Sequence, residues 1–333
     1  MKPFSSGNYS SWSIRTDERV KGASLEDKIR HILGYGVLAP SVHNSQPWKI
    51  KINASKVLIT VDHTRKLAVA DPEGRGMFIA IGAFVENIVQ AAPLVGMKAY
   101  VSYEEDYVVV KFADSQQRTH HTELAKAIVH RHSNKYPYDG LSDSSATYKQ
   151  LVTLCKGLPG VKLITAKEDL LAFEDIHLEA AQVVASNELF VRELLAWLRL
   201  NQTRRHDGMP GHIMGQSSLK TLLMRVSLGM QPGLFKKSLD KERLLLRHTP
   251  YVGIFCIKNE TAKDFIKIGR LIELFWLKLT TLGLVGHPLT AAVANSHTRH
   301  ELIKKFDLSD SPVFIMRVGA PTHKATNTPR RPA

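Results

Sequence analysis

The first third of the chain alternates between helical and extended patterns of apolar residues. Positions 25, 29, 32, 33 and 37 are apolar at the spacing of one helix face, which predicts a helix over 25–38. Residues 48–52 and 57–61 flank a short polar turn, which predicts a hairpin. A long apolar stretch then predicts a helix over 77–94, followed by a strand pair at 99–103 and 107–112. This order of elements is typical of an α+β unit.

The rest of the chain repeats this mixture around one segment of different composition. Helices are expected over 118–130, 143–155 and 169–200, strands over 161–165, 251–257 and 313–318, and a further helix from the capping box of Thr261 and Asp264. Residues 201–240 carry seven glycines and prolines around one short helix near 219–227, so we interpret them as an excursion from the core and a candidate lid. The two ends, 1–24 and 319–333, are expected to be a polar arm and an extended basic tail.

One glycine interval occurs twice, in two apolar helices far apart in the chain. Gly82 is followed 14 positions later by Gly96, and Gly269 is followed 14 positions later by Gly283. A glycine inside a helix usually reports close packing, and a glycine at its end suits a C-cap. The repeat suggests duplication of one α+β unit, although two such intervals can also recur by chance.

Composition places the chain among ordinary globular proteins. Of its 333 residues, 44% are hydrophobic and 23% are charged, which allows a large core. The apolar run 251–257 is far too short to cross a bilayer, and the first 23 residues lack the apolar centre of a signal peptide. We therefore expect a cytoplasmic protein with no membrane partner. Cys155 and Cys256 lie in apolar stretches and are interpreted as reduced core thiols.

The net charge of +14 could indicate a nucleic-acid-binding surface. The lysines and arginines are scattered along the whole chain, however, and no zinc-finger or comparable motif accompanies them. We interpret the surplus mainly as solubility and local phosphate binding. Binding to nucleic acid is kept as the less favoured alternative.

The segment from Ala39 to Trp48 concentrates polar groups between a predicted helix and a predicted strand. Ser41, His43, Asn44 and Gln46 supply closely spaced donors, which suits a planar ligand with carbonyl and ring-nitrogen acceptors. The alternative is a capped turn, in which one proline ends the helix and another starts the strand.

This decapeptide resembles the Ala-Pro-Ser-x-x-Asn-x-Gln-Pro-Trp motif of the nitroreductase family of flavin mononucleotide (FMN) enzymes, and more narrowly its Acg-like branch. Four further segments resemble that branch in the same order: Asp71–Arg75, the glycine helix from Gly82 to Gly96, Arg131–Lys135 and Thr328–Pro332. Together they span most of the chain.

The resemblance implies a nitroreductase-like α+β fold, built as a tandem pseudo-dimer of two halves, 1–118 and 119–333, with the lid excursion in the second. It implies one FMN between the halves, a functional monomer and an incomplete second site, since the second half has no copy of the decapeptide. The expected FMN contacts are Pro40, Ser41, His43, Asn44 and Gln46 of the flavin-edge loop 39–48, Arg131, Ser133 and Lys135 of the phosphate-binding segment 131–135, and Arg330 and Arg331 of the tail.

FMN carries hydride chemistry by itself, so this family needs no protein nucleophile. His43 and His287 are candidates for tuning the ring or supplying protons, with packing roles as the alternative. No metal is expected: His120, His121, His130 and His132 are interpreted as surface histidines, and His297 and His300 lack an evident third ligand. The predicted function is transfer of electrons from NADH or NADPH to nitroaromatics, quinones or similar electron-poor acceptors. The alternative is a flavin-storing protein whose lid blocks turnover.

Overall fold

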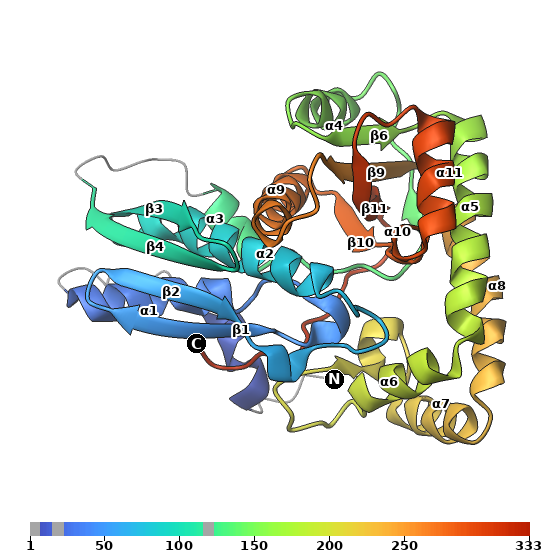
Figure 1. The fold of residues 1–333 in the computed structure, drawn as a ribbon, viewed down its shortest axis with the longest axis horizontal. Coiled ribbons are helices and arrows are strands. Elements are labelled where there is room, and N and C mark those ends of the chain that lie inside the picture. The colour runs from blue at the N-terminus through green and yellow to red at the C-terminus, as the bar shows by residue number, and fades with distance from the viewer. Residues whose placement is uncertain (1–6, 15–22, 116–122) are drawn as a thin grey trace.

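The computed structural model describes residues 7–14, 23–115 and 123–333, and these residues form two antiparallel sheets with helices between and around them (Figure 1). The helices are α1 (Leu25–Gly36), α2 (Arg75–Ala91), α3 (Glu123–Ile128), α4 (Ala146–Lys156), α5 (Lys167–Ser186), α6 (Glu188–Trp197), α7 (Ser218–Met230), α8 (Ser238–Arg247), α9 (Ala262–Thr281), α10 (Ala291–Ala294) and α11 (Ser296–Phe306). The strands are β1 (Trp48–Asn53), β2 (Lys56–Val61), β3 (Met97–Tyr103), β4 (Tyr107–Asp114), β5 (Tyr138–Asp139), β6 (Val161–Ile164), β7 (Leu198–Arg199), β8 (Met209–Pro210), β9 (Tyr251–Ile257), β10 (Val285–Pro288) and β11 (Ser311–Pro321).

The first sheet has the order β1-β2-β4-β3 and is buried on one face. The alternation in β1 follows from this, because Trp48 packs inward while the lysines at 49 and 51 point to solvent. Helices α1 and α2 pack on the buried face and supply a large part of its core.

The second sheet, β10-β11-β9-β6, is covered on both faces, and β5 pairs with the end of β11. All seven residues of β9 are buried. Tyr251, Phe255 and Ile257 pack with α9 and α4, while the even-numbered residues pack with α5, α10 and α11 (Figure 1). Burial on both faces explains why this strand is a continuous apolar run rather than an alternating one.

The two halves have the same topology. In chain order the first half runs α1-β1-β2-α2-β3-β4, and its sheet order β1-β2-β4-β3 is reproduced by β6-β9-β11-β10 in the second half. Helix α4 then corresponds to α1, and α9 corresponds to α2. Every pairing within both sheets is antiparallel. The predicted fold class, α+β with two equivalent halves in one chain, is therefore confirmed.

The glycine helices α2 and α9 lie side by side between the sheets and join the halves (Figure 1). A Cβ on Gly82 would lie 2.0 Å from the carbonyl oxygen of Ile266, and a Cβ on Gly269 would lie 2.2 Å from that of Ile79. The contact is thus reciprocal, as expected for an approximate two-fold relation. Gly96 and Gly283 both have positive φ, 71° and 73°, and end the corresponding segments.

Several sequence expectations need correction. The helix predicted over 169–200 is two helices, because the Asn187 side chain accepts hydrogen bonds from the amides of Leu189 and Phe190 and starts α6 there. Strand β10 had no sequence prediction. Helix α2 ends at Ala91, and Pro93 lies in the short 3-10 helix η5 (Ala92–Val95) that follows. Helices α8, α10 and α11 had no sequence prediction, although α7 was expected.

Two expectations fall on residues outside the described ranges. The predicted boundary between the halves, 118/119, lies within 116–122, as does the predicted start of the helix that contains α3. Most of the predicted N-terminal arm lies in 1–6 and 15–22, while the 3-10 helix η1 (Gly7–Ser13) is described. The division at 118/119 stays a prediction.

Among the described helices, the segment Arg75–Val95 is long and apolar enough to cross a membrane by length and composition. It comprises α2 and η5, and 61% of its most apolar window is buried inside the structure. Its apolar character is explained by packing against α1, α9 and the first sheet.

Candidate functional site

The loop between α1 and β1 has an unusual backbone. His43, Asn44 and Gln46 all have positive φ, at 50°, 56° and 53°, and lie in or beside the 3-10 helix η3 (Val42–Asn44). Non-glycine residues rarely adopt this conformation, and such strain concentrates at functional sites, where surrounding contacts hold it in place. Ser41 provides one of these contacts, since its Oγ accepts a hydrogen bond of 2.9 Å from the amide of Gln46.

The C-terminal tail is bonded to this loop. Arg330 donates a hydrogen bond of 2.6 Å to Asn44 Oδ1 and one of 3.2 Å to the carbonyl oxygen of Leu38, and its guanidinium stacks on Trp12. Arg331 donates its backbone amide to Gln46 Oε1 and a guanidinium N–H to the Gln46 carbonyl, at 2.8 and 3.0 Å. The structure places both arginines against the loop 39–48, where they hold Asn44 and Gln46, and their contact with FMN stays a prediction.

Arg131 reaches the same place from the second half. It is fully buried, donates a 2.9 Å hydrogen bond to the carbonyl oxygen of Leu38, and stacks on Trp276 with its CZ atom 4.6 Å from the ring centroid. Its Nε lies 2.9 Å from the carboxylate of Glu273, which is also fully buried. Burial raises the pKa of Glu273 to about 7 although the charge of Arg131 favours ionisation. The guanidinium of Arg131 therefore already has protein partners in Leu38, Glu273 and Trp276.

The excursion also binds the flavin-edge loop. The Asn44 amide donates to the carbonyl oxygens of Gly208 and Pro329, at 3.0 and 2.9 Å, and the Gln46 amide donates to that of His206 at 2.7 Å. In turn, the Gly208 amide donates to the Asn44 carbonyl. The polar groups of both side chains are therefore used to join loop, tail and excursion.

A second ion-pair cluster fixes the excursion beside the loop. Asp207 of the excursion accepts hydrogen bonds from Arg65 of the first half and from Arg199 of β7, and these cations hold the pKa of Asp207 below its usual value although burial opposes this. Arg65 also donates to the carbonyl oxygen of Ser45. Loop, first half and excursion are held as one unit.

Lys135 and His287 lie in a cluster with His43 and Arg317, close enough for their charges to interact. His287 faces Arg317 across the β10–β11 pair. Burial lowers the pKa of Lys135 to about 8, with Lys241 and Arg317 adding to the effect, and lowers that of His43 to about 4, with Lys135 adding to it. Burial and the two cations also lower the pKa of His287, so both histidines are neutral at pH 7.

This cluster has the unpaired donors that an anionic ligand requires. Among the described residues, Arg317 Nε and Nη1 are buried without a hydrogen-bond partner, Lys135 has no hydrogen bond or ion pair, and Nδ1 of His43 and of His287 is unpartnered. Burying a cation without a partner is costly, whereas a phosphate dianion would satisfy these donors. The donor set therefore fits the phosphate of FMN.

Arg317 was missed by the sequence analysis. It lies at the centre of an apolar strand and is fully buried, with its guanidinium 4.0 Å from the ring centroid of Tyr138. A lone arginine inside an apolar strand is itself a signal, because a buried charge needs a partner. Ser133, by contrast, was predicted and lies next to β10, where it forms a parallel bridge with Gly286.

The connection in the second half that is equivalent to the flavin-edge loop is much shorter than that loop. Between α4 and β6 only residues 157–160 connect helix and strand, whereas 37–47 connect α1 and β1. The short connection contains two glycines, a leucine and a proline, with no side-chain donor. This agrees with the prediction of an incomplete second site.

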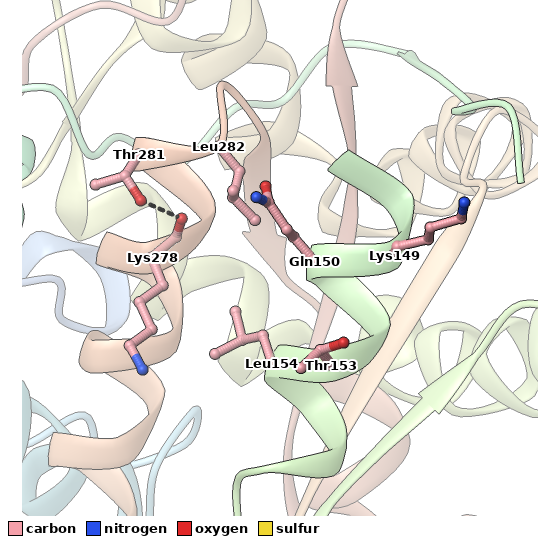
Figure 2. Close-up of a pocket in the computed structure, with 7 residues that line it drawn as sticks. All are labelled: Lys149, Gln150, Thr153, Leu154, Lys278, Thr281 and Leu282. Carbon is pink, nitrogen blue, oxygen red and sulfur yellow. Dashed lines mark hydrogen bonds between the residues drawn. The ribbon is translucent and has the colours of Figure 1, made fainter. Parts of the chain in front are cut away.

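The prominent surface hollow lies elsewhere. Figure 2 shows a hollow of about 440 Å³ between α4 and the end of α9, lined by Lys149, Gln150, Thr153, Leu154, Lys278, Thr281 and Leu282. A smaller one of about 170 Å³ lies at the starts of α2 and α9. Neither hollow is lined by a predicted site residue.

The histidines need two corrections. His132 is half-buried, not a surface residue: it contacts the Trp12 ring at 4.7 Å, and burial, aided by Arg131 and Arg330, lowers its pKa to about 3. His297 does have acidic neighbours, since Glu179 and Glu301 lie 3.5 and 3.7 Å from its Nε2. His297 and Glu179 are exposed and Glu301 is half-buried, the three have the geometry of ordinary ion pairs, and we assign no metal to them. His120 and His121 lie outside the described residues.

The contacts of Asn44 give a testable expectation. In Asn44→Ala the tail and the excursion lose three side-chain hydrogen bonds, so the excursion should open more often. We expect trypsin to cleave faster after the exposed Arg204 and Arg205, by about five- to tenfold. The exposed Asn53→Ala is the matched control. Equal cleavage rates in the two variants would show that Asn44 does not hold the excursion closed.

No protein-family model matches the chain. Two Mycobacterium tuberculosis proteins are similar to it over most of its length: "Putative NAD(P)H nitroreductase Rv3131", 23% identical with 92% of this chain and 89% of the relative covered, and "Putative NAD(P)H nitroreductase acg", 24% identical with 92% and 94% covered. Among solved structures, the FMN-dependent nitroreductase NfnB from Mycobacterium smegmatis, in complex with NADPH, aligns with 61% of this chain and 90% of its own, at 13% identity and a TM-score of 0.38.

The two curated relatives align over both halves of the chain, not over one. The resemblance to the nitroreductase family and its Acg branch, predicted from the decapeptide and the four further segments, is thereby confirmed.

Proposed function

We propose that the chain is an FMN-dependent oxidoreductase that takes electrons from NADH or NADPH and passes them to a nitroaromatic, a quinone or a similar electron-poor acceptor. The observation that carries this proposal is the meeting of the strained loop of the first half with buried guanidinium and imidazole nitrogens of the second half that lack a hydrogen-bond partner. The names of the curated relatives and of NfnB support the same reaction class.

The residues of the second half would hold the phosphate. Arg317 supplies two buried guanidinium nitrogens without a hydrogen-bond partner, Lys135 supplies a second cation, and the Ser133 hydroxyl can add a neutral donor. In the proposed arrangement Arg131 positions the flavin-edge loop through its hydrogen bond to the Leu38 carbonyl, and its positive charge adds to the electrostatic attraction of the phosphate. Arg330 and Arg331 have the same supporting role through Asn44 and Gln46.

The residues of the first half would face the ring. Bound FMN supplies the hydride chemistry, accepting and returning two electrons. The backbone of Pro40 and Ser41 and the neutral His43 ring would border its edge, and neutral His287 would lie on the second-half side. Neutral imidazoles can donate or accept one hydrogen bond without adding charge to the ring's surroundings.

We further propose one FMN per chain in a monomer with an internal pseudo-dimer, located in the cytoplasm. The reciprocal packing of α2 on α9 supplies within one chain the kind of interface that would otherwise need a second subunit. The short 157–160 connection supports a single site.

Anaerobic mixing with NADH and with NADPH tests the proposed reaction. Reduction should bleach the flavin, and menadione or a nitroaromatic should restore its colour. Lys135→Met should bind FMN about 10- to 100-fold more weakly, because a charge-assisted donor is lost. Lys126→Met, on the exposed face of α3, should bind FMN like the parent. A flavin that neither nicotinamide reduces would contradict the reductase proposal.

The alternative, a flavin-storing protein, is favoured by one observation: the excursion is bonded to both the loop and the tail through Asn44, Gln46 and His206. A closed excursion would admit a small reductant such as dithionite but exclude a nicotinamide. Asn44→Ala separates the two. If the parent is reduced only by dithionite and Asn44→Ala is also reduced by NADPH, the excursion is a lid that can permit turnover. If neither is reduced by nicotinamides, storage is the better proposal.

A further inference from the structure

Helix α7 carries its apolar residues on the outside. Leu219, Leu222, Leu223, Val226 and Met230 are all exposed, at 45–79%. At about 100° per residue these five lie within an arc of about 100° on the helix surface. The opposite side, with Thr221 and Leu228, is the side buried against the protein. The pattern therefore does not serve the core.

The rim of this apolar stripe is cationic. Lys220 and Arg225 flank it on its two sides, and Lys236 and Lys237 follow in the 3-10 helix η7 (Pro232–Lys237), which packs on α7. From residue 208 to residue 239 the chain has no acidic residue, and the whole chain carries a net charge of +14. A helix with an exposed apolar stripe between basic residues has the composition of one that lies in the surface of an anionic bilayer.

We propose that α7 docks on anionic membrane surfaces, with its five exposed apolar side chains entering the bilayer surface and its basic residues contacting lipid headgroups. A second copy of the chain is a poorer partner, because it would place the same cationic rims against each other. The sequence analysis expects no membrane partner because the run 251–257 is too short to span a bilayer, and interfacial docking revises that expectation because it needs no spanning segment. Figure 1 shows α7 at the edge of the molecule, with α6 on its inner side, where a flat surface can reach it.

The docking helix is linked to the proposed flavin site. Its buried Thr221 packs against Gly211, where a Cβ would lie 1.8 Å from the Thr221 hydroxyl. Gly211 begins η6 (Gly211–Met214), directly after the segment in which Gly208 binds Asn44. Aromatic rings also connect the surroundings of α7 with the flavin-edge loop. The ring centroid of Phe190 in α6 lies 6.1 Å from that of His43 in the loop and 6.3 Å from that of Phe235 in η7.

On this basis, and resting on the proposed function, the acceptor class is a quinone dissolved in the bilayer. NAD(P)H gives up a hydride and becomes NAD(P)+, and the quinone takes two electrons and two protons, one proton equivalent from the hydride and one from solvent, and becomes the hydroquinone. Membrane contact at α7 would place the excursion, and therefore the entrance to the site, at the surface where such acceptors concentrate.

Vesicle flotation tests the docking without any need for flavin. The full chain should bind vesicles of phosphatidylcholine mixed with phosphatidylglycerol at least about tenfold more tightly than vesicles of phosphatidylcholine alone. The double variant Leu223→Glu with Val226→Glu should lose this binding by about tenfold or more, since two apolar side chains become anionic. Leu171→Glu with Val183→Glu, equally exposed on α5, is the matched control and should bind like the parent.

A second variant, Lys220→Glu with Arg225→Glu, keeps the apolar stripe and should also weaken binding, more strongly at low salt. The proposal is overturned if the parent binds neither kind of vesicle, or if the α7 variants bind as the parent does. It is also overturned if the parent does not bind vesicles but forms a dimer, and the double variant Leu223→Glu with Val226→Glu abolishes that dimer.

Turnover separates the docking from the proposed function. With a long-chain quinone in anionic vesicles, NAD(P)H oxidation by the parent should exceed that of the Leu223→Glu, Val226→Glu variant several-fold, while the two oxidise NAD(P)H equally with soluble menadione. Vesicle binding with no oxidation in either assay would overturn the proposed function and the acceptor class and leave the docking supported. Equal rates of parent and variant on the vesicle quinone would overturn the acceptor class alone.

Discussion

Gly82→Ala should lower the free energy of unfolding by at least about 3 kcal/mol. The added Cβ would lie 2.0 Å from the Ile266 carbonyl oxygen and 2.8 Å from the Arg270 amide nitrogen, both of which are backbone atoms of α9. Backbone atoms cannot change rotamer as a side chain can, so α2 and α9 would have to move apart to accommodate the added Cβ. Chemical denaturation with far-UV circular dichroism measures the change.

Gly229→Ala is the control. Gly229 is also inside a helix, α7, but a Cβ there would meet nothing within 4 Å. Alanine is the better helix former, so this substitution should be neutral or stabilise the protein by up to about 1 kcal/mol. If Gly82→Ala costs less than about 1 kcal/mol, the close approach of α2 and α9 does not hold the two halves together as the structure indicates.

Arg131→Ala should lower the free energy of unfolding by about 3–5 kcal/mol, because it leaves the Glu273 carboxylate buried without its cation. The exposed pair of Arg30 and Glu26 is the control, since Arg30→Ala should cost less than about 0.5 kcal/mol. Denaturant titration gives both values. A cost for Arg131→Ala as small as that for Arg30→Ala would show that the buried pair is not ionised.

The double variant Arg131→Met with Glu273→Leu separates structure from flavin binding. Replacing both charges by apolar groups of similar size is often close to neutral, so most of the stability should return. If FMN binding returns with it, Arg131 is a structural residue that positions the loop. If stability returns and FMN binding does not, Arg131 contacts the phosphate directly, as the resemblance to the nitroreductase family implies.

Features that depend on local sequence were predicted well. The glycine interval identified α2 and α9 because a glycine within an apolar helix has few explanations besides close packing, and Gly82 and Gly269 indeed meet each other's helix. The capping box also started a helix as predicted, with Thr261 accepting a hydrogen bond from the Asp264 amide. These signals need no knowledge of distant contacts.

Features that depend on distant contacts were not predicted. The break between α5 and α6 lies within an uninterrupted helical pattern, and only the capping side chain of Asn187 marks it. The tail follows β11 without a helix, and Arg330 is buried with its guanidinium on Asn44. Nothing near residue 330 in the sequence indicates that partner. The loop 39–48, the segment 131–135 and the tail were assigned to one site only through the resemblance to the nitroreductase family. Arg317, in contrast, could have been identified as a candidate site residue because it is a lone charge within an apolar strand.

The exposed stripe of α7 shows a different limit of pattern analysis. A helical pattern of Leu219, Leu222, Leu223 and Val226 predicts a helix correctly, but periodicity alone assigns the apolar face to the core. The structure turns that face outward and buries Thr221 and Leu228 instead. Which face a helix buries is decided by its neighbours, here α6 and η7.

The central claim is that one FMN lies between the loop of the first half and the cations of the second. Its most direct test is the amount of FMN released by denaturing the purified full chain after incubation with excess FMN and removal of the unbound fraction. The account predicts one FMN per chain for the parent and a clearly lower amount for Lys135→Met at limiting FMN. No FMN retained by the parent, or two per chain, would contradict it.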